Sequence, residues 1–243
     1  MLSTVRRALS QPLVARWLTL PDLAWRTAVV PQGSQTVTVE GPDSDRILLA
    51  GSGLAVGFAA QSHEFALGGH LARQVSAITG RGARVDILAG PQLEIDRLCT
   101  LLDSARLASL DVLVATLGTV ETLAETTPKQ WRGQVESFLS HVSAHGPASL
   151  QVLLVATPEL SRLVPMDRAI GQAVDRSAVL LNAEVAQACA LHRNVTFVPF
   201  TPQVRPPDAT VTSETYAGWA SLIAPMVGAA LNAQVTGERM PLP

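Results

Sequence analysis

The sequence predicts an α/β protein in which helices cover both faces of a central parallel sheet, forming a three-layer α/β/α sandwich with five strands. Apolar runs of strand length alternate along the chain with amphipathic segments of helix length. The strand runs are rich in Val, Ile and Leu, as expected for strands buried on both faces. The length of 243 residues suits one such domain, which buries roughly 70–75% of its unfolded surface.

The predicted elements follow one another in regular order. The strands are short, continuous apolar runs at residues 46–51, 84–89, 111–117, 150–156 and 195–200. The helices have apolar residues at helical spacing and span residues 65–79, 93–107, 128–145, about 161–192, and 213–232. Gly80 and Gly146 stand where two of these helices end. Residues 36–40 alternate as a short edge strand does.

The first 45 residues form a separate unit in this prediction, an amphipathic helix and a linker, followed by the α/β domain at 46–235 and a tail at 236–243. Arginines interrupt the apolar pattern of the first 20 residues, which is unlike a signal peptide. No run of 18 apolar residues predicts a membrane span. We therefore expect a cytoplasmic protein. The less favoured alternative is that its N-terminal helix docks on a protein partner or a membrane face.

The composition excludes several function classes. The 18 basic and 20 acidic residues are interspersed, so no basic stripe indicates a nucleic-acid partner. Cys99 and Cys189 lie in apolar helical patterns and are expected to be buried, reduced thiols. The glycine-containing turn after the first main strand lacks the spacing of a dinucleotide site, and Asp86 lies too far along the chain for its acidic residue. We therefore expect that this chain binds neither a cofactor nor a metal ion.

The most informative stretch is residues 46–57, which read RILLAGSGLAVG. A strand here runs into a turn of small residues, at the end of the sheet where α/β proteins place reactive groups. The stretch resembles the first block of the SGNH, or GDSL-type, hydrolases, which reads Gly-Asp-Ser followed by three residues and a Gly. Matching the closing glycine to Gly57 places Gly51 at the first glycine, Ser52 at the aspartate and Gly53 at the nucleophilic serine.

The resemblance extends over about residues 46–230 and implies the SGNH-hydrolase-like, flavodoxin-like sheet. In the second block the family uses a glycine N–H to bind the oxyanion, and Gly90 matches that glycine. The third block is Gly-x-Asn-Asp in the family, where the Asn completes the oxyanion hole. Gly118 matches its glycine, whereas Val120 stands at the Asn and Glu121 at the Asp.

The last block of the family is Asp-x-x-His, in which the His is the base and the Asp orients it. Asp208 aligns with the Asp, and Val211 then stands at the His. No histidine follows His192, so the chain has no substitute for this base later in its sequence. The resemblance therefore implies loss of the nucleophile, of one oxyanion donor and of the base, each a separate contribution to the rate.

The leading hypothesis is a pseudo-esterase that binds a small molecule, an acyl chain or a protein partner and forms no acyl-enzyme. Its ligand pocket is predicted at the carboxyl ends of the strands, lined by Gly51, Gly53, Gly90, Gly118, Val120, Glu121 and Val211. The alternative is an active esterase or acyltransferase that uses Ser52 with a displaced base such as His63, or carboxylate chemistry with Glu121 and Asp208. A third class is a scaffold that associates through residues 201–207 and the N-terminal helix.

Structural interpretations stand beside these functional ones. The turn glycines either cradle an anion or permit close packing of helix on strand. His63 either lines the pocket or takes part in helix capping, and His70 suits a satisfied, partly buried imidazole. Glu121 and Glu125 are general-base candidates or charges in a first helical turn. His141 and His145 have a spacing that suits a metal, but their place near a helix end favours a surface role.

Overall fold

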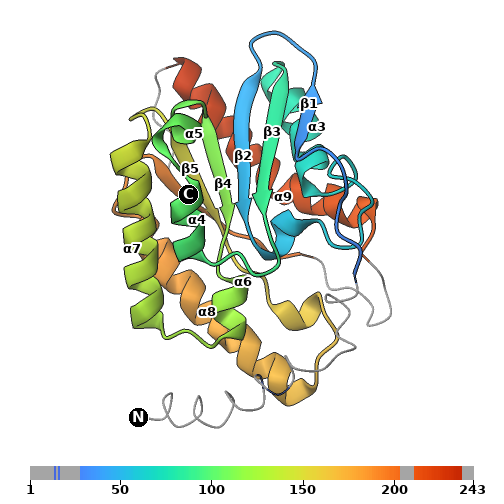
Figure 1. Cartoon of the computed structure of the whole chain (residues 1–243), viewed down its shortest axis with the longest axis vertical. Helices are drawn as coiled ribbons and strands as arrows, with labels where there is room; N and C mark the ends of the chain where they lie inside the picture. The colour runs from blue at the N-terminus through green and yellow to red at the C-terminus, as the bar shows by residue number, and fades with distance from the viewer. Residues whose placement is uncertain (1–13, 15, 17–27, 203–210, 237–243) are drawn as a thin grey trace.

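The sheet of this protein has six strands in the order β1-β3-β2-β4-β5-β6 (Figure 1). The computed structural model describes residues 14, 16, 28–202 and 211–236. The strands are β1 (Thr36–Val39), β2 (Asp45–Gly51), β3 (Ala83–Ala89), β4 (Val112–Thr116), β5 (Gln151–Val155) and β6 (Val195–Val198). All neighbouring strands are parallel except β1 and β3. The predicted order of alternating strands and helices is confirmed.

The sheet has six strands, whereas the sequence analysis predicted five. The five predicted strands are present and parallel, but β1 adds a sixth by pairing antiparallel with β3, with Thr36 opposite Asp86. The Thr36 hydroxyl also donates a hydrogen bond to the Asp86 carboxylate. The pattern of residues 36–40 predicted a strand but not its partner, because pairing depends on residues far along the chain.

Alternating residues of each strand pack against two different helical layers, as the three-layer prediction requires. In β2, Ile47 and Leu49 join one core, and Leu48 and Ala50 join the other. The first core is closed by α3 (Leu67–Thr79) and α9 (Ser213–Thr236). The second is closed by α4 (Ile95–Leu101), α5 (Ser104–Ala108), α7 (Pro128–His145) and α8 (Arg168–Cys189). Figure 1 shows these two groups on opposite faces of the sheet.

Local capping chemistry explains where the helices differ from the prediction. The helix expected at 93–107 is divided into α4 and α5, because the Asp103 side chain accepts a hydrogen bond from the Arg106 N–H and starts a new helix. The helix expected at 161–192 becomes η2 (Leu160–Arg162) followed by α8, with Pro165 between them. A short helix, α6 (Thr119–Leu123), and a 3-10 turn, η1 (Gly53–Val56), were not predicted.

The N-terminal region contacts the domain through Val14. This residue is 1% exposed and packs with Leu160 and Val174, next to the beginning of α8. Most of the expected N-terminal helix and the tail after Thr236 lie outside the described residues. Among the helices that are described, none has the length and apolarity required to cross a bilayer.

Both cysteines carry free thiols. Cys189 is buried, and this burial raises its pKa to about 12. Cys99 is half-buried, and burial likewise raises its pKa. The expectation of reduced thiols is consistent with these surroundings, which disfavour the reactive thiolate form.

At the amino end of β2, a buried ion pair ties the strand to two helices. The Asp45 carboxylate, 6% exposed, accepts hydrogen bonds from Arg81 Nε at 2.8 Å and from the Thr79 hydroxyl at 3.0 Å. Arg81 also donates to Asn232 of α9 at 3.1 Å. The pair therefore joins the end of α3, the beginning of β2 and the end of α9.

We predict that Asp45→Ala lowers the free energy of unfolding by about 3 kcal/mol, because it leaves the mostly buried Arg81 without its counter-charge. Urea unfolding followed by circular dichroism measures this change. Glu184→Ala is the control, since it removes an ion pair to the largely exposed Arg132 and should cost less than about 1 kcal/mol. Equal losses for the two variants would contradict the role given to the buried pair.

Candidate functional site

The carboxyl end of β2 is held against the end of β4 by two hydrogen bonds between Ser52 and Thr116. The Ser52 N–H donates to the Thr116 carbonyl at 2.9 Å, and the Thr116 hydroxyl donates to the Ser52 carbonyl at 2.8 Å. Gly51 has φ +120°, and a Cβ on this residue would lie 2.3 Å from the Thr116 carbonyl oxygen. Only glycine fits here, so Gly51 serves the close approach of two strands.

Ser52, the serine of the active-enzyme hypothesis, is fully buried in this turn. Its hydroxyl oxygen has no hydrogen-bond partner within the described residues, and neither does Nδ1 of His63. The proposed Ser52–His63 hydrogen bond is therefore not formed in this structure. His63 is also buried, which lowers its pKa. Its carbonyl accepts a hydrogen bond from the Gly69 N–H at 2.9 Å near the start of α3.

Gly53, which the resemblance places at the nucleophile, faces Thr119 of α6. A Cβ on Gly53 would lie 2.4 Å from the Thr119 hydroxyl oxygen and 3.2 Å from its Cβ. The backbone at Gly53 is left-handed, with φ +60°. The Thr119 side chain thus occupies the space into which a residue 53 side chain would project. Sequence reasoning did not identify Thr119, because only the folded chain brings these two turns together.

The two groups that the resemblance assigns to the oxyanion hole are not free donors. The Gly90 N–H donates to the Gly51 carbonyl at 3.1 Å. Val120 lies half-buried in α6 and offers no polar side-chain atom. Gly118 is the N-cap residue of α6, with φ +95°, and its carbonyl accepts the Thr122 N–H at 2.8 Å. The Gly118–Thr122 bond stabilises the turn that follows β4, and the Gly90–Gly51 bond joins the ends of β3 and β2.

The last block lies only partly within the described residues. Asp208 and most of the Pro-rich segment fall outside them. Val211 is half-buried and packs against the core under α9. Close by in the sequence, the Ser213 hydroxyl lies 2.8 Å from Nε2 of His70, on α3. His70 is half-buried, and its burial, with a smaller contribution from Arg73, lowers its pKa. This serine–histidine contact was not predicted, because its residues are distant in sequence.

Glu121 lies in the first turn of α6, as the structural interpretation expected, and its carboxyl group is buried. It is 5% exposed, and its Oε1 accepts a hydrogen bond from the Ile95 N–H at 3.1 Å, at the beginning of α4. Burial raises the pKa of Glu121. Glu125 is also buried, with φ +49°. Oε2 of each glutamate lacks a hydrogen-bond partner among the described residues. Glu121 therefore links α6 to α4, across the strand ends where a pocket was predicted.

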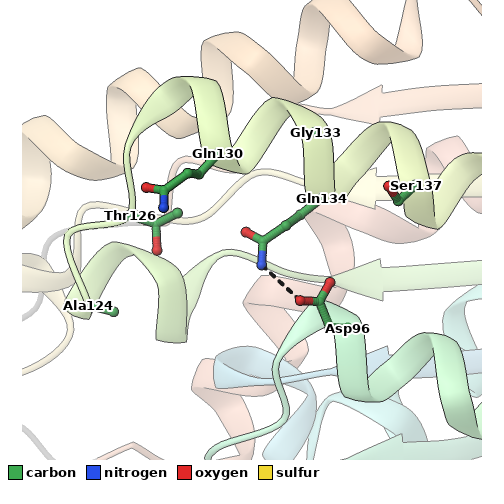
Figure 2. A pocket seen from close by; sticks show the side chains of 7 residues that line it. All are labelled: Asp96, Ala124, Thr126, Gln130, Gly133, Gln134 and Ser137. Atoms are coloured by element: carbon green, nitrogen blue, oxygen red, sulfur yellow. Dashed lines mark hydrogen bonds between the residues drawn. The ribbon is translucent and has the colours of Figure 1, made fainter.

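A polar groove of about 750 Å³ lies between α4 and α7, beside the end of α6 (Figure 2). Its lining consists of Asp96, Ala124, Thr126, Gln130, Gly133, Gln134 and Ser137. None of these residues belongs to the predicted pocket. Figure 2 shows Gln134 and Asp96 pointing toward one another, and Gln134 Nε2 donates to Asp96 Oδ2 at 3.2 Å. The polar positions of α7 recur at helical spacing, but that pattern alone is equally typical of a solvated helix face.

The histidine pair of α7 makes local contacts. His141 Nε2 lies 2.7 Å from the Leu102 carbonyl, and His145 Nδ1 lies 2.8 Å from the His141 carbonyl. The two rings stack with their centroids 4.3 Å apart. Within the described part of the chain, no group of three or more His, Cys, Asp or Glu side chains could hold a metal ion.

Comparison with known proteins finds similarity in structure only. No protein-family model matches the sequence, and no curated protein matches it. The lipase Lip_vut3 from a goat rumen metagenome is 12% identical, with a TM-score of 0.58 over 74% of this chain and 95% of its own. Phospholipase A1 from Streptomyces albidoflavus is 14% identical, with a TM-score of 0.52 over 81% of this chain and 100% of its own.

A third similar structure carries the name of the predicted family. It is a candidate GDSL-like lipase from Bacteroides ovatus, 15% identical, with a TM-score of 0.54 over 79% of this chain and 55% of that one. At these identities the similarity concerns the fold. The chain has the fold of the SGNH and GDSL hydrolases, as the sequence predicted.

We predict that Gly53→Ser lowers the free energy of unfolding by about 2–4 kcal/mol, because the new side chain meets Thr119 on a left-handed backbone. Thr119→Ala should recover part of this loss in the double variant by opening the space. Urea unfolding of the two single variants and the double variant measures the coupling. A Gly53→Ser protein as stable as the wild type would show that Thr119 does not exclude a side chain.

We further predict that Glu121→Gln raises the free energy of unfolding at pH 7. A carboxyl group with a raised pKa binds its proton more tightly in the folded state. The free energy of unfolding therefore falls as the pH rises from 4.5, the ordinary pKa of glutamate, through the raised pKa of Glu121 in the folded state. The amide keeps an oxygen for the Ile95 N–H and carries no charge to bury. Urea unfolding at pH 7 and pH 5 should show the advantage of the variant shrinking at the lower pH, whereas a constant difference would exclude this explanation.

Proposed function

We propose that this chain is a non-catalytic relative of the SGNH esterases, which binds a small molecule and forms no acyl-enzyme at the end of β2. The contact between Gly53 and Thr119 carries the proposal: a Cβ at residue 53 would lie 2.4 Å from the Thr119 hydroxyl oxygen. A serine nucleophile needs a side chain at this position and a base within hydrogen-bond reach. The neighbouring turns are built without space for that side chain.

Three further features support the proposal. The Gly90 N–H is engaged by the Gly51 carbonyl, and the Val120 side chain has no donor to offer a developing oxyanion. Ser52 is buried, without a partner among the described residues to accept its proton. Each of these features removes a different component of acyl transfer, so restoring one alone should not restore the reaction.

A second candidate function, an esterase with a relocated nucleophile, is favoured by one observation. The Ser213 hydroxyl and His70 Nε2 are 2.8 Å apart. In such an enzyme the Ser213 oxygen would attack an ester carbonyl while its proton passed to His70, and the departing alkoxide would then take that proton. Because α3 follows β2 and α9 follows β6, both residues lie toward the carboxyl end of the sheet. This contact replaces the Ser52 pair as the active-enzyme alternative.

A fluorophosphonate probe distinguishes these two functions, because it forms a covalent bond with an activated serine. We expect no adduct on Ser52 or Ser213 in the wild type after tryptic mass spectrometry, and no hydrolysis of p-nitrophenyl acetate above that of His70→Gln. The glutamine retains a hydrogen-bonding amide near Ser213 but cannot act as the base.

The serine variants make each outcome specific. An adduct at Ser213 that disappears in Ser213→Ala and His70→Gln would overturn the non-catalytic proposal and establish the relocated site. An adduct that disappears only in Ser52→Ala would overturn both candidates. Ser221→Ala is the matched control on α9, because its exposed hydroxyl donates to the Gly218 carbonyl and contacts no imidazole among the described residues.

A further inference from the structure

The short helix α6 buries its polar side chains and leaves its apolar ones partly exposed. Glu121 is 5% exposed and Thr122 is fully buried, whereas Val120 and Leu123 are only half-buried. Neither of these apolar residues belongs to the two cores that hold the sheet. Because burial of apolar surface is the main source of local stability, α6 is held less firmly than the longer helices.

Three buried side-chain oxygens on or beside α6 lack hydrogen-bond partners among the described residues. They are Glu121 Oε2, Thr122 Oγ1 and Glu125 Oε2. Each of these atoms has lost contact with water without gaining a partner, which costs free energy. A movement of α6 away from the strand ends would return the three oxygens to water and remove this penalty.

Residues with a left-handed backbone stand at both ends of α6. Gly118, its N-cap, has φ +95°, and Glu125, two residues after its last residue, has φ +49°. This conformation is strained for a side chain as large as glutamate, and strained residues of this kind gather in segments that switch position. Rotation at these two residues would move α6 while leaving β4 and the capping box of α7 in place.

α6 lies at the carboxyl ends of the strands (Figure 1). Its first residue, Thr119, takes the space beside Gly53 after β2. Its N-cap packs equally closely after β5, where a Cβ on Gly118 would lie 2.5 Å from the Thr157 hydroxyl oxygen. Ser52, in the turn after β2, has no exposed surface. In this position α6 closes the strand ends at which the sequence predicted a ligand pocket.

Within the described residues, one side-chain hydrogen bond joins α6 to α4. It runs from the Ile95 N–H to Glu121 Oε1 at 3.1 Å. Burial raises the pKa of Glu121, and the charge of Glu94, the N-cap of α4, raises it further. No described Arg or Lys forms an ion pair with Glu121. Other ionisable side chains on or next to the elements around α6 are Glu125, Asp96 of α4, Lys129 of α7, and Asp175 and Arg176 of α8.

We propose that α6 is a lid over the end of β2, closed while Glu121 is protonated and opened when this carboxyl group loses its proton to water. The inference rests on the proposed function, because the lid controls access to the strand-end site at which a small molecule would bind. A carboxyl group in the closed lid holds its proton more tightly than one in water. Opening therefore increases as the pH rises above 4.5, the ordinary pKa of glutamate.

Labelling of a thiol at position 52 with N-ethylmaleimide tests the lid in the full chain. Ser52→Cys places the thiol in the closed turn, where the reagent reaches it only when α6 opens. Tryptic mass spectrometry measures the labelling rate at pH 5 and pH 7, with and without Glu121→Gln. Because pH changes the reactivity of the thiol itself in both proteins, the ratio of their rates isolates the lid. We expect a ratio near one at pH 5 and roughly ten at pH 7, since the amide cannot ionise.

Glu125→Gln is the matched control, because it removes a second buried carboxyl group that makes no hydrogen bond to α4 among the described residues. It should leave the rise in labelling between pH 5 and pH 7 unchanged. The proposal is overturned if the ratio for Glu121→Gln is the same at both pH values, or if Glu125→Gln removes the rise as completely as Glu121→Gln does.

Hydrogen exchange measured by nuclear magnetic resonance provides a second test without any change at Ser52. Relative to its intrinsic exchange rate, the Ile95 N–H should lose protection between pH 5 and pH 7 in the wild type and keep it in Glu121→Gln. The Val114 N–H, in the middle of β4, should stay protected in both, because it reports global unfolding. Equal protection of Ile95 in the two proteins at pH 7 would also overturn the lid. Neither measurement uses a ligand or an ester, so a fluorophosphonate adduct would overturn the proposed function without bearing on the lid.

Discussion

The close approach of β2 and β4 at their carboxyl ends determines the surroundings of the candidate site. Gly51 permits this approach, and Thr116 fixes it with a carbonyl that accepts from the Ser52 N–H and a hydroxyl that donates to the Ser52 carbonyl. With both backbone groups of Ser52 engaged, the turn buries its side chain. Gly53 is then directed toward Thr119, which stands at the start of the next turn. One strand contact thus sets the positions of the serine, the glycine and the threonine together.

The SGNH-hydrolase-like fold of this chain depends on apolar packing of its sheet and not on polar groups at the strand ends. Two cores hold the strands, one under α3 and α9 and the other under α4, α5, α7 and α8. None of these contacts requires a nucleophile, a base or an oxyanion donor. At the strand ends, Glu121 makes a structural bond by accepting from the Ile95 N–H at the beginning of α4.

Local patterns predicted much of the fold, whereas contacts between distant segments limited prediction of the site. Thr127, Pro128 and Gln130 mark the beginning of α7 with a capping box, so that helix could be placed from sequence. The parallel strands were equally clear from their apolar runs. The contacts of Gly53 with Thr119 and of His70 with Ser213 join residues from separate elements, and no local pattern indicates them. The burial of Ser52 likewise depends on Thr116 of another strand.

The antiparallel strand β1 has a consequence for how the protein behaves at high concentration. By pairing with β3, it covers backbone donors and acceptors that could otherwise recruit a strand from a second molecule. Its four residues are too short to offer an extended template of their own. The hydrogen bond from the Thr36 hydroxyl to the Asp86 carboxylate also holds β1 against β3. A few residues outside the five-strand pattern therefore shield the edge of β3 from pairing with a strand of a second molecule.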